Sequence, residues 1–179
     1  MMNKKLAVLT AFLLCVAMIA AAQQDKSKRP SPAANAQCQF SDGKTVKVDY
    51  SSPRAKGRKI FGDLVPYGKV WRTGANEATT FVTDANLTAG GKDIPSGNYT
   101  IFTVPGPDKW TLIVNKKTGE WGIPYKYESD ELARVDMSVS KTSAPVENFT
   151  IAFDQKGDTC TMRLEWENTR AQVDISEKK

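Results

Sequence analysis

Apolar and polar residues alternate along much of the chain with a period of two residues. In the first clear run, Val46, Val48 and Tyr50 alternate with Lys47 and Asp49. Successive side chains of a β-strand point to opposite faces of the sheet, so this pattern predicts half-buried antiparallel strands. The alternation recurs at residues 134–139, 149–153 and 160–166, and segments rich in Thr, Val and aromatic residues predict further strands at 79–84, 98–104 and 110–115.

Turn-forming residues separate these runs at short intervals. Short strands divided by Gly, Pro, Asn and Asp at such spacing indicate a β-sandwich or barrel. We therefore expect an all-β fold with little helix, a single antiparallel β-sandwich that is jelly-roll-like or Ig-like. The expected core comprises Val46, Val48, Phe102, Leu112, Val135, Val139, Ile151, Phe153, Leu164 and Trp166.

The N-terminus has the organisation of a secretory signal peptide. Lys4 and Lys5 precede an apolar run, and the small residues Ala20 to Ala22 follow it. A membrane anchor is the alternative, but it needs about 20 apolar residues and this run is shorter. We expect residues 1–22 to be cleaved and the protein to be exported, periplasmic or extracellular, and not integral to the membrane.

Residues 23–37 differ from the rest of the chain in composition. They are polar, rich in Lys, Ser, Pro and Ala, and show no apolar period. This composition is typical of a flexible linker. We expect a tether over residues 23–37 and the β-sandwich domain over residues 38–179.

Composition excludes several kinds of chemistry. The chain of 179 residues contains no His, so it has no Ser-His-Asp triad and no histidine metal ligand. Its formal net charge of +5 includes Lys4 and Lys5 of the expected signal peptide. The remaining excess is small for a nucleic-acid-binding domain. We expect no nucleic-acid partner, no cofactor and no metal site.

Two cysteines, Cys38 and Cys160, remain after the expected cleavage. An even number of cysteines in an exported domain indicates a disulfide, and two buried free thiols are the alternative. The bond would close a very long loop, for which the chain-entropy model gives about 4–5 kcal/mol of stabilisation as an upper figure.

Three long motifs resemble one protein family. In sequence letters they are YSSPRAKGRKIFG from Tyr50, LVPYGKVWRTGANEATT from Leu64 and DIPSGNYTIFTVP from Asp93, followed by WTLIVN from Trp110. The chain is similar over residues 38–175 to the domain-of-unknown-function family 2911, which is found in exported bacterial proteins. The resemblance implies an exported, mostly β protein of bacterial type. It implies no established activity and no catalytic residues.

The segment 51–78 interrupts the strand pattern and carries the first candidate site. A long irregular connection in a compact domain is often functional. Arg72 can bind a carboxylate or phosphate, Asn76 and Glu77 offer further polar groups, and Trp71 offers a stacking face. We expect a pocket for a small anionic or sugar-like ligand. The alternative is an Arg72–Glu77 ion pair that fastens the segment to the sandwich.

A basic cluster in the same segment is a second candidate. Arg54, Lys56, Arg58 and Lys59 lie within six residues of one another. They are candidates for binding an anionic polymer or ligand. A solvated loop is the alternative, because runs of charge are commonly just that.

Aromatic residues form the third candidate. Trp121 and Tyr125 lie in an expected loop, where exposed rings could stack on a sugar. Ordinary packing of large residues is the alternative.

These candidates favour a non-catalytic binding module of the cell envelope. Its partner would be a glycan, a small anion or an envelope protein. One rival is a hydrolase that uses carboxylates near residues 51–78, and the other is a structural or assembly protein without a small ligand. The loop carboxylates that could serve a hydrolase are Asp63, Glu77, Glu120, Asp130 and Glu131.

Overall fold

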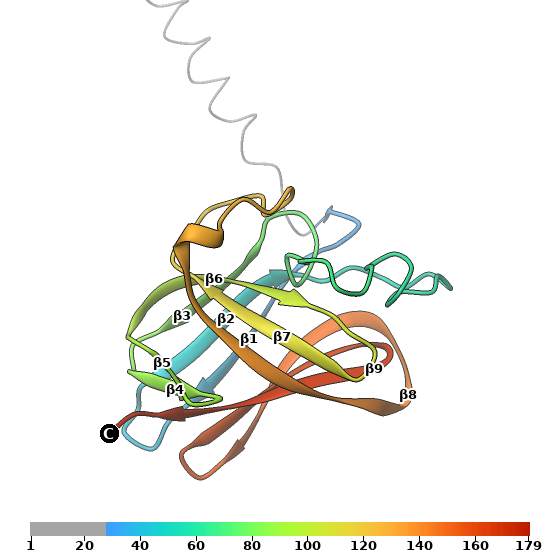
Figure 1. Ribbon diagram of the computed structural model, residues 1–179. Helices are drawn as coiled ribbons and strands as arrows, with labels where there is room; N and C mark the ends of the chain where they lie inside the picture. The colour runs from blue at the N-terminus through green and yellow to red at the C-terminus, as the bar shows by residue number, and fades with distance from the viewer. Residues whose placement is uncertain (1–27) are drawn as a thin grey trace, which may run out of the picture.

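The computed structural model describes residues 28–179, and the expected signal peptide at 1–22 lies outside the described residues. Nearly all regular structure is β, and no helix within residues 28–179 is long and apolar enough to cross a bilayer. One 3₁₀ turn, η2, spans Glu128–Asp130. The strands in Figure 1 are β1 (Ala33–Gln39), β2 (Thr45–Ser51), β3 (Thr79–Thr83), β4 (Leu87–Ala89), β5 (Lys92–Ile94), β6 (Gly97–Val104), β7 (Lys109–Asn115), β8 (Glu131–Lys156) and β9 (Thr159–Glu177).

The nine strands form one antiparallel sheet in the order β1-β2-β3-β6-β7-β8-β9-β4-β5, which confirms the expected all-β class. Strand β8 pairs with β7 as far as Ser138 and with β9 from there onward. Its register with β9 shifts between Lys141 and Thr150. The two expected strands at 134–139 and 149–153 are therefore parts of one long, bent strand.

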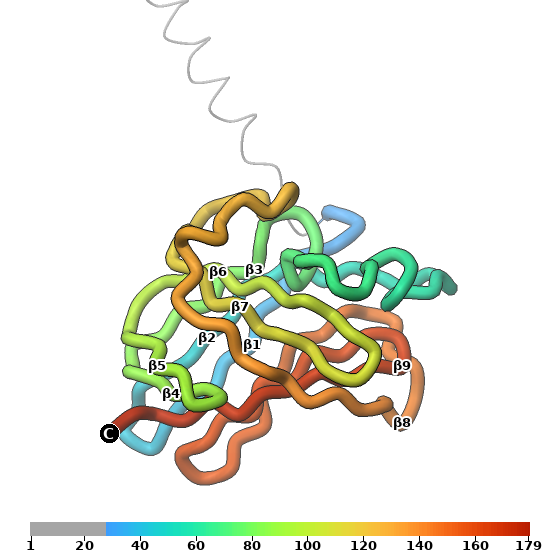
Figure 2. The backbone as a smooth tube through the Cα atoms, in the orientation of Figure 1, coloured from blue at the N-terminus to red at the C-terminus, as the bar shows by residue number. Residues whose placement is uncertain are grey.

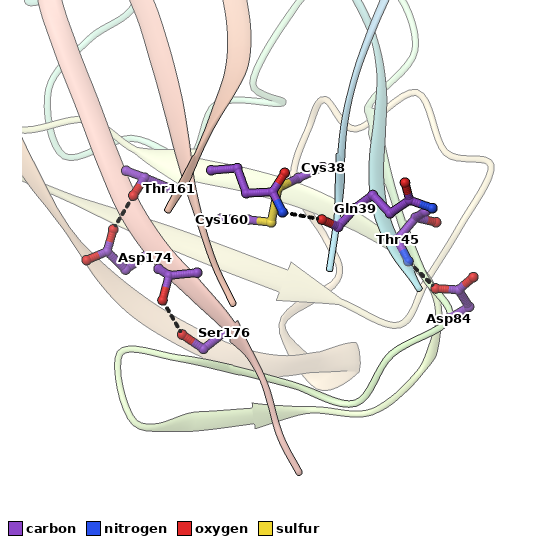
Figure 3. Close-up of a disulfide and its surroundings, with 10 residues drawn as sticks. Cys38, Gln39, Thr45, Asp84, Cys160, Thr161, Asp174 and Ser176 are labelled. Carbon is purple, nitrogen blue, oxygen red and sulfur yellow. Dashed lines mark hydrogen bonds between the residues drawn. A yellow bond between two sulfur atoms is a disulfide. The ribbon is translucent and has the colours of Figure 1, made fainter. Parts of the chain in front are cut away.

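The sheet curls until its first strand lies beside the β8–β9 hairpin (Figure 2). The expected disulfide is confirmed and joins Cys38 of β1 to Cys160 of β9 (Figure 3). Beside it, the Gln155 amide nitrogen donates a hydrogen bond of 2.6 Å to the Gln39 carbonyl oxygen. These contacts fasten the two halves of the curled sheet to each other.

Nine of the ten expected core residues belong to one cluster in the space that the curled sheet encloses. Seven of these nine are buried, and the other two, Val139 and Phe153, are half-buried. Phe102 is also buried, but in a separate cluster with Ala78 and Ile113. The strand pattern therefore located most of the interior correctly.

The folded domain begins earlier than expected. Ala33–Gln37 belongs to β1 and pairs with β2, so these residues of the expected tether are part of the sheet. Inward-facing and outward-facing residues do alternate in β1, and the inward-facing Ala34 and Ala36 pack partly against the core. Alanine side chains are small and only weakly apolar, so this strand carried no clear signal in the sequence.

Replacing both Cys38 and Cys160 with alanine is expected to lower the free energy of unfolding by about 3 kcal/mol, because the unfolded chain is no longer constrained. For a chain of this length, the thermal midpoint should fall by roughly 6–12 °C. Thermal denaturation with and without dithiothreitol tests this. Reductant should lower the wild-type midpoint and leave that of the double variant unchanged. Equal midpoints for the oxidised wild type and the variant would contradict the prediction.

Candidate functional site

The segment 51–78 is anchored to the core through Trp71, which is 7% exposed. Its ring lies among those of Phe149, Trp166 and Trp110, with centroid distances of 4.9, 6.0 and 6.3 Å. Aromatic pairs at such distances add to the stabilisation from burial. Trp71 is therefore chiefly a core residue, and its buried ring is not an open stacking face.

The turn after Trp71 has an unusual backbone. Thr73 is fully buried and has a φ of 56°, a conformation that β-branched residues rarely adopt. Hydrogen bonds fix the turn: the Trp71 Nε1 donates to the Gly74 carbonyl at 3.0 Å, and the Thr79 hydroxyl donates to the Thr73 carbonyl at 2.7 Å. The Thr73 and Thr103 hydroxyls also lie 3.1 Å apart. The segment thus holds a strained shape next to β6.

The candidate residues Asn76 and Glu77 bind the chain that precedes β1. The Asn76 Nδ2 donates to the Ser31 carbonyl at 3.0 Å. Nη1 of Arg29 donates to both carboxylate oxygens of Glu77, at 2.9 and 2.8 Å. The alternative interpretation had supposed an ion pair between Arg72 and Glu77. An ion pair does fasten this segment, but the cation that pairs with Glu77 is Arg29.

Arg72 instead lies against Trp121. Its guanidinium carbon is 5.1 Å from the centre of the Trp121 ring, and Nη1 donates a long hydrogen bond of 3.5 Å to the Trp121 carbonyl. Its Nε is buried without a hydrogen-bond partner. Burial lowers the pKa of Arg72, and the negative charge of Glu77 opposes this shift. The structure therefore brings together two residues that lie 49 positions apart.

A cavity of about 390 Å³ opens between these elements. Its lining comes from Ser31, from parts of segment 53–75, and from Ile123 and Trp166. Leu64, within that segment, and Ile123 are 45% and 49% exposed. The cavity is thus open to solvent, and part of its rim is apolar.

Three cations line the cavity, namely Arg58, Lys69 and Arg72, and no carboxylate does. Of the basic cluster at residues 54–59, only Arg58 is among the residues that line this cavity. Arg58 reaches the cavity, whereas Arg54 is half-buried and donates to the carbonyl and hydroxyl oxygens of Ser52, each at 2.9 Å. The structure does not gather the four basic residues into the cavity.

The loop that carries Trp121 and Ile123 is fixed by a small outer cluster of aromatic rings. Tyr125 and Tyr127 pack on Phe102 of β6, with centroid distances of 4.8 and 5.9 Å. The candidate residue Tyr125 is therefore part of the packing under the loop, while Trp121 is 55% exposed.

A polar network completes the attachment of this loop. The Tyr125 hydroxyl donates to Glu131 at 2.6 Å, and Arg134 donates to the same carboxylate at 2.7 and 2.8 Å. The hydrogen bonds from Arg134 and Tyr125 hold the pKa of Glu131 below its usual value. Burial and the neighbouring Glu131 raise the pKa of Tyr125.

Several cavity residues were not singled out from the sequence, among them Leu64, Lys69 and Ile123. One local signal was Gly122, which has a φ of 88°. A Cβ atom there would lie 2.9 Å from the Ala78 Cβ and 3.1 Å from that of Arg72. Only glycine allows this close approach, so Gly122 marks the place where the two walls meet.

Replacing Glu131 with glutamine should lower the free energy of unfolding by about 1–2 kcal/mol at pH 7, through loss of its charged hydrogen bonds. A carboxylate whose pKa is lowered on folding stabilises the protein above the usual pKa, here 4.5, and loses that effect as the pH falls further. Urea denaturation of both proteins from pH 7 to pH 3 should therefore show the difference shrinking below about pH 4.5. The exposed Glu128, replaced with glutamine, is the control. A difference that is constant with pH would contradict the prediction.

Comparisons with known proteins identify the family but no activity. Residues 28–179 contain no cluster of His, Cys, Asp and Glu that could hold a metal ion. No curated protein matches the chain, and no solved structure matches it. The family model described as "Protein of unknown function (DUF2911)" matches residues 31–175. The chain therefore belongs to this family, as its motifs had indicated.

Proposed function

We propose that the protein is an exported, non-catalytic binding module of the cell envelope. Its ligand is a small polar or anionic molecule or a glycan, held in the cavity between segment 53–75 and Ile123. The observation that carries the proposal is the cavity itself, whose volume of about 390 Å³ falls in the range of small-molecule sites. Its mixture of apolar walls and a few charged groups is also typical of such sites.

Two features support export. The N-terminal sequence has the organisation of a signal peptide. The Cys38–Cys160 disulfide is of a kind that persists in oxidising compartments and is rare in the cytosol.

Binding is better supported than hydrolysis. None of the five candidate loop carboxylates lines the cavity. Glu77 is paired with Arg29, and Glu131 is paired with Arg134. A glycoside hydrolase needs two carboxylates facing one substrate across a short gap, and the cavity offers none.

Binding is also better supported than an assembly role. Within residues 28–179, the large apolar side chains that remain exposed are Leu64, Tyr67, Trp121 and Ile123. Leu64 and Ile123 line the cavity, and Trp121 contacts Arg72 in its wall. Three of these four side chains thus lie at one small hollow, which is less than a broad interface needs.

Thermal unfolding of the purified protein against a ligand panel tests the proposal. The panel holds neutral glycans, acidic polymers, small carboxylates, phosphates and divalent metals. A ligand at 100 times its dissociation constant stabilises the fold by about 2.7 kcal/mol, and for a chain of this length the midpoint should rise by roughly 5–11 °C.

Ala75→Phe, which places a ring in the cavity, should abolish this shift. Thr88→Phe adds the same ring on β4, outside the cavity lining, and should leave the shift intact. A flat panel, or a shift that Ala75→Phe does not reduce, would overturn the proposal.

A further inference from the structure

Most of the polar side chains that line the cavity are hydrogen-bond donors and not acceptors. Its charged side chains are Arg58, Lys69 and Arg72, and its other polar side chains are Ser31 and two tryptophans, whose ring N–H groups already donate to the carbonyls of Gly74 and Glu147. Cations and indoles only donate hydrogen bonds, so Ser31 offers the single side-chain acceptor. A neutral sugar presents both donors and acceptors, and among the lining side chains only Ser31 could accept from its hydroxyl groups. An anion presents acceptors alone and matches this lining.

Arg72 also lacks a counter-charge in direct contact. No carboxylate within residues 28–179 forms an ion pair with it, and Glu77 is paired with Arg29. Its guanidinium is held by the Trp121 ring and one long hydrogen bond, and its Nε has no partner. A half-buried guanidinium in this state gains most from an added acceptor, because charge-assisted hydrogen bonds are the strong ones.

The rest of the lining is apolar. Leu64, Val70 and Ile123 face the same hollow as the cations, with Trp71 and Trp166 beside them. Leu64 and Ile123 remain about half exposed. A ligand with a hydrocarbon body would cover them, and each methylene group that it buries strengthens binding up to about fourfold.

We infer that the ligand is an amphipathic anion, with a carboxylate or phosphate head held at Arg72 and Lys69 and an apolar body against Leu64, Val70 and Ile123. This inference rests on the proposed function, whose ligand it narrows. It distinguishes the site from one for neutral glycans and from one for metal ions.

Titrations followed by tryptophan fluorescence test the inference, because Trp71 and Trp166 line the cavity and Trp121 contacts Arg72. The probes are butanoate, hexanoate, octanoate, octyl phosphate and the neutral alcohols of the same lengths. Affinity should rise with chain length for the acids, and octanol should bind at least tenfold more weakly than octanoate. Comparing octanoate with octyl phosphate identifies the preferred head.

Variants separate the two parts of the site. Arg72→Gln should weaken octanoate binding about 10- to 100-fold and octanol binding little, since it removes charged hydrogen bonds. Lys69→Gln should also weaken octanoate binding. It changes an exposed side chain, so it provides the test if Arg72→Gln fails to fold. Ile123→Ser should flatten the dependence on chain length. Lys92→Gln removes the same charge from β5, on the opposite side of the molecule from segment 51–78 (Figure 1), and should change nothing.

Two results would overturn the inference: equal affinity for octanoate and octanol, or octanoate binding that neither Arg72→Gln nor Lys69→Gln weakens. If these anions fail to bind but a neutral glycan stabilises the protein and Ala75→Phe abolishes that effect, the inference is wrong and the proposed function stands. If nothing binds in the cavity, both are wrong.

Discussion

The insertion of the Trp71 ring into the core determines the position of everything around the cavity. The segment 51–78 has almost no regular structure, and a chain of that kind has no fixed shape of its own. Trp71 supplies the constraint, since its ring packs among the core aromatics while its backbone exchanges two hydrogen bonds with Thr103, of 2.7 and 2.9 Å. Lys69, Val70 and Arg72 follow or precede this anchor by one or two residues. Their places in the cavity are consequences of where one indole packs.

The second wall of the cavity is the loop that carries Trp121 and Ile123, and different contacts hold it in position. Tyr125 holds its loop on the outer face of β6 through Phe102 and Glu131. Gly122 then lets the loop backbone touch Arg72, and Trp121 covers the guanidinium. The two walls are thus joined by a cation–π contact and by the absence of one Cβ atom. The cavity lies between two anchored segments, so the fold of the protein itself sets its shape.

These origins explain which features could be predicted from the sequence. The strands, most of the core and the disulfide follow from alternation and cysteine count, which are local or compositional signals. The continuity of β8 was hidden because its middle, residues 140–148, is polar and contains Pro145. The partner of Glu77 was hidden because Arg29 lies 48 residues away. Arg72 was singled out from the sequence, but its contact with Trp121 joins segments whose meeting depends on the packing of whole strands. No pattern within a single window of the sequence encodes that meeting.

The backbone conformation of Thr73 and the partial burial of Arg72 both cost stability. A buried left-handed Thr73 costs on the order of 1–3 kcal/mol, and such strain persists only where the surroundings enforce it. Removing a charge from water adds a further cost, which is visible here as the lowered pKa of Arg72. Neither cost is offset by an ion pair on Arg72 within residues 28–179. If stability alone determined the residue at position 72, a shorter or fully solvated side chain would be favoured over Arg72. Strain beside an incompletely satisfied cation supports the proposed anion site, because a bound anion would complete the interactions that Arg72 leaves open.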